Sequence, residues 1–184
     1  MKRSPLILEI TKTALLVIDL QERILPVMLD AETVIQNTLK LVEGCKILNV
    51  PAYYTEQYPK GLGATENRIK NALQSDAISK MTFSCIGAGD LFEQLKHSNI
   101  KQVIVSGVET HVCVQQTVLD LLANDFQVNL AADAVSSRKR IDYETALQRM
   151  RANGAEVTTT ESILFELLNI CGTDQFKSIS KLVK

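Results

Sequence analysis

Short apolar segments alternate with amphipathic helical patterns along nearly the whole sequence, and this alternation limits the folds open to the chain. The run from Ala14 to Ile18 is apolar without a break, as in a strand covered on both faces. Other strand-like segments occupy residues 51–55, 77–80, 103–105, 128–132 and 156–159. Strands that alternate with helices form βαβ units. The sequence therefore predicts an α/β fold in which helices enclose a mostly parallel, six-stranded sheet.

The size and composition of the chain indicate one globular domain. Its 184 residues show no break in composition, so residues 1–184 are interpreted as a single domain. Hydrophobic residues make up 46% and charged residues 22%, which is ordinary for a globular protein. The formal net charge is −1, and charges of both signs are interspersed. This balance argues against a nucleic-acid or membrane-surface partner.

The sequence predicts neither an export signal nor a membrane anchor. Two basic residues precede a short apolar patch, and Glu9 ends this patch well before the length of a signal-peptide core. No apolar run approaches the roughly 18 residues that a membrane-spanning helix requires. These features predict a cytoplasmic protein.

Five positions stand at the carboxyl ends of predicted strands. In open parallel sheets, ligands bind just outside these ends, where the strand order reverses. The positions are Asp19, Thr55, Lys80, Gly107 and Asp133. We therefore expect the functional site among them, although Asp133 alone is more typical of loop and capping chemistry.

Cys113 is the strongest candidate for a reactive side chain. It follows a buried strand and begins a helix that Thr110 is expected to cap. The unpaired N–H groups and the dipole of a first helical turn favour a thiolate over a thiol. Such positions lower a cysteine pKa from about 8.5 to roughly 3.5–7.5. We interpret Cys113 as a nucleophile; a buried core cysteine is the alternative.

Asp19 and Lys80 complete a plausible set of reacting groups. Asp19 ends the first strand, where its carboxylate could accept a proton or simply cap a loop. Lys80 ends the third strand and, taken alone, is more typical of an exposed loop. An activated thiol needs a proton acceptor and a positive neighbour. Asp19 and Lys80 would supply these to Cys113.

The other cysteines are widely spaced and form no Cys-x-x-Cys pair, which predicts free thiols. Cys45 and Cys171 follow the apolar pattern of helices and are expected in the core. Cys85 is ambiguous, because it lies in the loop that follows Lys80.

Three segments carry the candidate residues in a fixed order: residues 14–21 (ALLVIDLQ), 80–84 (KMTFS) and 107–114 (GVETHVCV). In this order they resemble the first strand, the lysine motif and the nucleophile loop of the isochorismatase-like cysteine hydrolases. Residues 55–63 (TEQYPKGLG) and 132–138 (ADAVSSR) most resemble the isochorismatase domain-containing subgroup. The resemblance extends roughly from Leu15 to Leu168, and the ordered set is far more specific than any single segment.

The resemblance implies a Rossmann-like three-layer sandwich with a catalytic triad of Asp19, Lys80 and Cys113. It also implies a non-proline cis peptide bond at Val108–Glu109. That bond would direct the backbone N–H groups of Glu109 and Cys113 toward a developing oxyanion. Relatives of this kind need no cofactor, and many are oligomers, so a cofactor-free homo-oligomer is expected.

The expected substrate is a small molecule with an amide-like C–N bond, cleaved through a thioester-type intermediate. Family members that cleave isochorismate typically lack the cysteine, so its presence favours thiol chemistry. By their places in these motifs, Gln21, Phe83, Val108 and Thr110 are expected to contact the substrate. Phe83 could instead pack beneath the pocket.

A metal site is not expected. The nicotinamidase branch of the family carries histidine ligands after the second strand, whereas residues 54–58 of this chain contain none. The only histidines are His97, in a polar turn, and His111. His111 lies two residues from Cys113, a spacing that does not share a helix face.

Two other functions fit the same residues. The chain could be a catalytically inert interaction protein that retains the fold. It could also be a thiol redox sensor, which would need a resolving cysteine near Cys113, and Cys85 is the candidate.

Overall fold

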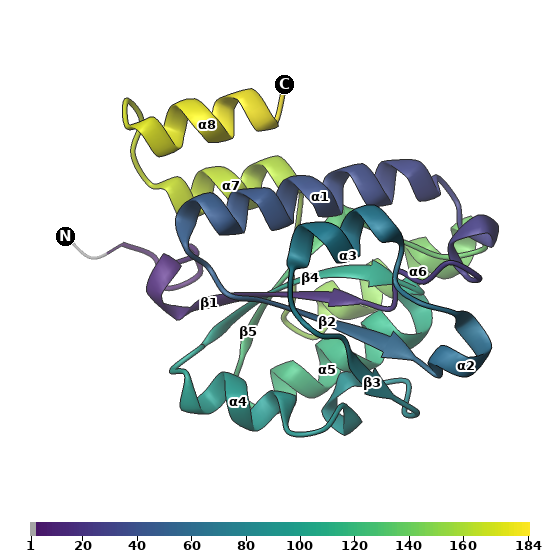
Figure 1. Cartoon of the computed structure of the whole chain (residues 1–184). Helices are drawn as coiled ribbons and strands as arrows, with labels where there is room; N and C mark the ends of the chain where they lie inside the picture. Colours follow the sequence, from purple (N-terminus) through teal and green to yellow (C-terminus); the bar gives the residue numbers. More distant parts are fainter. Residues whose placement is uncertain (1–2) are drawn as a thin grey trace.

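The computed structural model describes residues 3–184 and contains one six-stranded sheet (Figure 1). Its strands are β1 (Thr13–Ile18), β2 (Ala52–Gln57), β3 (Ile78–Lys80), β4 (Gln102–Val108), β5 (Gln127–Ser136) and β6 (Glu156–Thr158). Their order in the sheet is β3-β2-β1-β4-β5-β6, and each neighbouring pair is parallel. The predicted α/β fold is confirmed, and its sheet is parallel throughout rather than mostly parallel.

Helices cover both faces of the sheet (Figure 1). One face packs against α1 (Ala31–Leu48), α3 (Asn67–Leu73) and α7 (Thr160–Leu168), and α8 (Asp174–Leu182) packs on the outer side of α1 and α7 (Figure 1). The other face packs against α4 (Leu91–His97), α5 (Gln115–Ala123) and α6 (Arg140–Ala152). Side chains along β1 alternate between the two hydrophobic cores, Leu15 toward the α1 core and Leu16 toward the α5 core. Because both faces are covered, β1 is apolar at nearly every position.

Three helices were absent from the sequence prediction: α2 (Pro59–Leu62), α3 and α8. α2 is a single turn, too short to show a helical period. α3 begins at a Glu66 cap, whose carboxylate accepts hydrogen bonds from two backbone N–H groups of the first turn. No helix within residues 3–184 combines the length and apolarity needed to cross a membrane.

Gly107 allows the two central strands to approach closely at their carboxyl ends. It pairs with Ile18 across β1 and β4, and its φ angle of +121° lies in a region that side chains rarely adopt. A Cβ atom at this position would lie 2.0 Å from the carbonyl oxygen of Ile18. Only glycine therefore fits at position 107, where β4 passes close to Ile18, the residue before Asp19.

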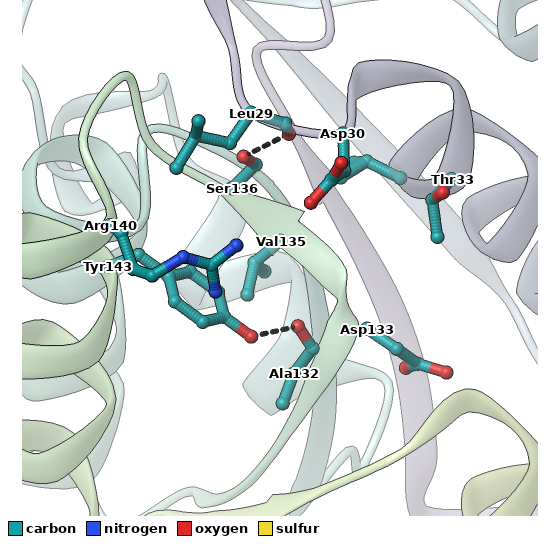
Figure 2. Close-up of a pocket in the computed structure, with 10 residues that line it drawn as sticks. Leu29, Asp30, Thr33, Ala132, Asp133, Val135, Ser136, Arg140 and Tyr143 are labelled. Atoms are coloured by element: carbon teal, nitrogen blue, oxygen red, sulfur yellow. Dashed lines mark hydrogen bonds between the residues drawn. The ribbon is translucent and has the colours of Figure 1, made fainter.

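β5 is interrupted opposite the end of β4. The register with β4 shifts between Val105 and Gly107, and the extra residues of β5 form a bulge. Tyr143 Oη donates a hydrogen bond to the bulge carbonyl of Ala132 at 2.7 Å, beside a cavity of about 130 Å³ (Figure 2). The cavity lies between the beginnings of α1 and α6, on the opposite side of β4 from Lys80.

Candidate functional site

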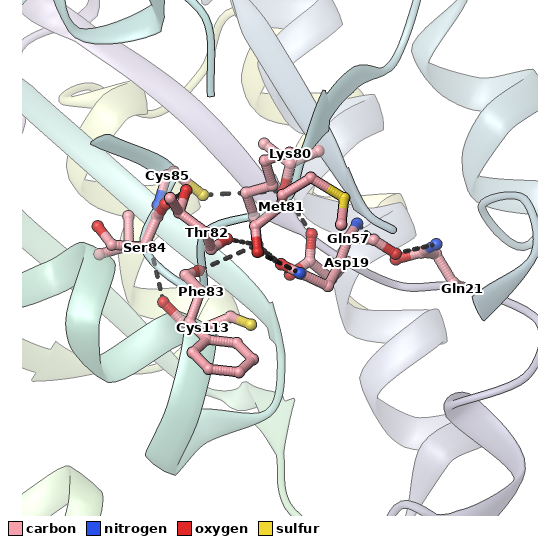
Figure 3. Close-up of polar contacts among 12 residues, drawn as sticks. Asp19, Gln21, Gln57, Lys80, Met81, Thr82, Phe83, Ser84, Cys85 and Cys113 are labelled. Carbon is pink, nitrogen blue, oxygen red and sulfur yellow. Dashed lines mark hydrogen bonds and ion pairs between the residues drawn. The ribbon is translucent and has the colours of Figure 1, made fainter. Parts of the chain in front are cut away.

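The carboxyl ends of β1, β3 and β4 bring three predicted residues to one edge of the sheet (Figure 3). Asp19 follows β1 directly, in the left-handed conformation with a φ angle of +53°. Lys80 is the last residue of edge strand β3. Cys113 lies in the turn of helix that follows β4. The reversal of strand order between β1 and β4 places the site where open parallel sheets bind ligands.

Asp19 and Lys80 form a buried ion pair. Lys80 Nζ lies 2.7 Å from Asp19 Oδ2, and the two side chains are 0% and 1% exposed. The other carboxylate oxygen accepts a hydrogen bond of 2.8 Å from Thr55 Oγ1. Lys80 Nζ also donates to Gln57 Oε1 at 2.8 Å and to the Phe83 carbonyl at 3.0 Å. Lys80 is therefore a buried, fully engaged cation rather than an exposed loop lysine.

Cys113 lies in a π-helical turn, Thr110–Val114, that continues into α5. Glu109 precedes this turn, and its carbonyl accepts from the Val114 N–H at 3.2 Å, five residues along. The predicted Thr110 cap is wrong. The Thr110 hydroxyl is buried without a hydrogen-bond partner in the described chain, so it does not bind the N–H groups of the turn.

The Cys113 thiol is protonated in the resting protein. Burial, followed by the negative charge of Asp19, raises its pKa to about 12, and Lys80 offsets only part of this shift. The prediction of a lowered cysteine pKa is therefore wrong, because desolvation outweighs the dipole of the first helical turn. The site holds a neutral thiol beside a carboxylate that can accept its proton.

This raised pKa predicts how alkylation of Cys113 depends on pH. Since the thiolate is the reactive form, the rate of modification by iodoacetamide should rise about tenfold for each pH unit between pH 7 and 10. Peptide mass spectrometry would measure the rate, with exposed Cys171 as the reference in the same sample. A rate that levels off below pH 8 would contradict the protonated thiol.

A narrow pocket of about 90 Å³ opens onto the thiol. Its walls are mainly apolar, with a few polar groups at the inner end: Asp19, Ile24, Gln57, Leu62, Phe83, Val108, Glu109, Val112 and Cys113. Phe83 and Val108, both expected at the substrate, line this pocket; Phe83 is 54% exposed. Gln57 was missed because the predicted strand stopped at residue 55, whereas β2 runs to Gln57. Ile24, Leu62 and Val112 were missed because they lie outside the strands, where no strand end marks them.

Gln21 and Thr110 do not line the pocket, in contrast to the expectation from their motifs. Gln21 is fully buried, and its Nε2 donates to the carbonyls of Gln57 and Gly63 at 3.0 and 2.7 Å. Its Oε1 accepts from the Gln57 N–H at 2.8 Å. Gln21 thus fixes the backbone of Gln57, and it is the Gln57 side chain that reaches Lys80.

The peptide bond between Val108 and Glu109 is cis, at the junction of β4 with the turn that carries Cys113. Glu109 is buried, and its Oε2 accepts a hydrogen bond of 2.9 Å from Nε of Arg138, which follows β5. The nucleophile loop is thus tied to the segment after β5.

Cys85 lies behind the site. Its Sγ is 3.8 Å from Thr55 Oγ1, and burial raises the pKa of its thiol to about 11. Cys45 is buried in the core, as predicted. Cys171 is exposed, so its predicted place in the core is wrong; it lies beyond the end of α7, which stops at Leu168.

Neither of the two histidines is placed to bind a metal ion together with other ligand side chains of the described residues. His111 Nδ1 is 3.0 Å from Ser137 Oγ, and His97 Nδ1 is 2.8 Å from the Glu93 carbonyl. Within residues 3–184, no three His, Cys, Asp or Glu side chains are arranged to hold a metal ion.

Comparison with known proteins identifies one family. The family model described as the isochorismatase domain matches residues 13–162. Isochorismatase family protein 1B of Dictyostelium discoideum is 38% identical over 177 residues, which cover 94% of this chain and 86% of that protein. The structure of the MAR1 ribonuclease from Caenorhabditis elegans superposes with a TM-score of 0.90 at 36% identity, covering 96% of this chain and 91% of that one. The Escherichia coli YcaC gene product, described as an octameric hydrolase of unknown specificity, shares the fold with a TM-score of 0.89 at 23% identity, covering 98% and 92%.

Proposed function

Because the chain belongs to the isochorismatase family, we propose that it is a cysteine-dependent hydrolase of a small molecule with an amide-like C–N bond. The observation that carries the proposal is the buried ion pair of Asp19 and Lys80 beside the thiol of Cys113. A buried carboxylate next to a protonated thiol is the arrangement that general-base activation of a nucleophile requires. The narrow pocket favours a small substrate.

In the first half of the reaction, Asp19 accepts the thiol proton as Cys113 Sγ attacks the carbonyl carbon of the substrate. The charge of Lys80 balances Asp19 while the proton moves. Asp19 then returns the proton to the leaving nitrogen, the C–N bond breaks, and a thioester on Cys113 remains.

In the second half, Asp19 accepts a proton from water as the water oxygen attacks the thioester carbon. The S–C bond breaks, the acid product leaves, and Asp19 returns the proton to Sγ. Each group ends in its starting protonation state, so the cycle needs no cofactor and no external proton donor.

The backbone N–H groups of Glu109 and Cys113 are our candidates for the oxyanion hole. Both belong to the loop that begins at the cis peptide bond and carries the nucleophile. A donor in this role typically lowers the barrier by about 2.7–4 kcal/mol.

Trapping the acyl-enzyme tests the proposal. The full chain is incubated with a panel of small amides and activated esters, quenched in acid, and mapped by peptide mass spectrometry. We expect the mass of the acyl group on the Cys113 peptide and none on the peptide of exposed Cys171. Turnover of a substrate with no adduct on Cys113, or with the adduct elsewhere, would reject the mechanism.

The same experiment separates the alternatives. An inert interaction protein would turn over no member of the panel and form no adduct. A redox sensor would instead form a Cys113–Cys85 disulfide after peroxide treatment, detectable in the same peptide map.

We propose that this chain does not share the ribonuclease activity named for the C. elegans protein. The residues that line the pocket, all within the described chain, include two carboxylates, Asp19 and Glu109, and no lysine or arginine. Such a pocket offers a phosphodiester no lysine or arginine to bind. We also propose that the chain forms a homo-oligomer, as the E. coli octamer does.

A further inference from the structure

Glu109 is the second acidic residue that lines the pocket, after Asp19. The residue is 7% exposed. Its Oε2 accepts hydrogen bonds from the backbone N–H of Arg138 at 3.2 Å and from Arg138 Nε at 2.9 Å. Oε1 accepts no hydrogen bond from the described residues, and it is not among the fully buried atoms. One carboxylate oxygen is therefore held by Arg138, and the other has no donor among the described residues.

The two carboxylates of the pocket differ in how their charges are balanced. Asp19 faces a Lys80 cation that is completely buried, so the attraction between them is strong. Glu109 faces Arg138, whose side chain is 59% exposed and therefore screened by water. The charge that a substrate meets in the pocket is then mainly that of Glu109.

We propose that Glu109, held in place by Arg138, selects substrates by charge. The pocket accepts acyl groups that are neutral or carry an ammonium or hydroxyl donor, and it rejects those that carry a carboxylate. This inference rests on the proposed function in one respect only, namely that a ligand in the pocket reaches Cys113. Glu109 acts here as a specificity residue, and Arg138 as its positioning residue.

Two substitutions distinguish charge selection from simple loop anchoring, because their effects should have opposite signs. Glu109→Gln removes the negative charge, so anionic ligands should gain relative to neutral ones. Arg138→Gln removes the balancing positive charge, so anionic ligands should lose further. If the pair only anchored the loop, both substitutions would disturb the site in the same direction. Arg140→Gln is the matched control, since it removes an equal charge two residues away without a hydrogen bond to Glu109.

The probes are iodoacetamide, which is neutral, and iodoacetate, which is anionic, because alkylation requires no turnover. The ratio of their rates at Cys113 is divided by the same ratio at Cys171, which corrects for intrinsic reactivity. We expect wild type to favour iodoacetamide by about tenfold or more. Glu109→Gln should remove most of this preference, Arg138→Gln should increase it, and Arg140→Gln should leave it unchanged.

Equal ratios at Cys113 and Cys171 in wild type would overturn charge selection and leave the hydrolase proposal intact. A shift in the same direction for Glu109→Gln and Arg138→Gln would also overturn it. Should Glu109→Gln fail to fold, wild type and the more exposed Arg138→Gln still decide the question. A Cys113 that reacts with neither reagent even at pH 10 would overturn both proposals, since no ligand would then reach the thiol.

Discussion

Replacing Cys113 with alanine is expected to lower kcat/KM by at least on the order of 1,000-fold for any substrate that acylates the enzyme. Without the sulfur no covalent intermediate can form, and only binding and the oxyanion donors remain. Steady-state kinetics on the substrate found by adduct trapping would measure the loss. The fold should persist, because the substitution removes a single atom from a residue that already lines a pocket.

Cys171→Ala is the matched control for this loss. Its thiol is exposed and lies outside the pocket, so its removal should leave kcat/KM unchanged. Cys113→Ser is a second variant, which replaces the thiol with a hydroxyl of nearly the same size. It should also be strongly impaired, because a hydroxyl at this position is a weaker nucleophile than the thiol. Full turnover by Cys113→Ala would exclude the cysteine as nucleophile.

Lys80→Met is expected to reduce the free energy of unfolding by about 3–5 kcal/mol and to abolish turnover. The substitution keeps the shape of the side chain but leaves the Asp19 carboxylate buried without its cation. Urea denaturation followed by circular dichroism would measure the loss of stability. Activity should fall as well, because the charge that balances Asp19 during proton transfer is gone.

Lys12→Met provides the comparison for the stability change. Lys12 pairs with Glu9 at 2.8 Å, but both side chains are nearly half exposed, so this loss should cost no more than about 1 kcal/mol. The double variant Lys80→Met with Asp19→Asn should recover part of the lost stability without recovering activity. If the two lysine variants were equally stable, the buried pair would not be the special interaction that its geometry indicates.

Much of the fold could be predicted from local sequence because burial imposes a pattern on each element. β1 is covered on both faces, so an unbroken apolar run predicts it, and the carboxyl end of that run marks Asp19. α8 also carries a local pattern, with Phe176, Ile179 and Leu182 at helical spacing, but this pattern was overlooked in the sequence. Where α8 packs could not be predicted, because its position depends on contacts with α1, more than 100 residues earlier in the chain.

The candidate site was predictable in position but not in electrostatics. Strand ends locate Asp19, Lys80 and Cys113, because they depend on topology alone. The protonation of Cys113 depends on how deeply the fold buries its sulfur, which is a long-range property. The exchange of roles between Gln21 and Gln57 has the same origin, since hydrogen bonds between residues 36 positions apart determine which amide faces the pocket.

Gly107 also constrains how the site can move. With no side chain between Gly107 and the Ile18 carbonyl, the ends of β1 and β4 are in direct backbone contact. We therefore expect Asp19 and Cys113, which follow these two strand ends, to move together with little change in their separation. Adjustment to a larger substrate has to come from the side chains of the facing wall, where Met81 and Phe83 are 70% and 54% exposed while Gln57 and Lys80 hold their carbonyls.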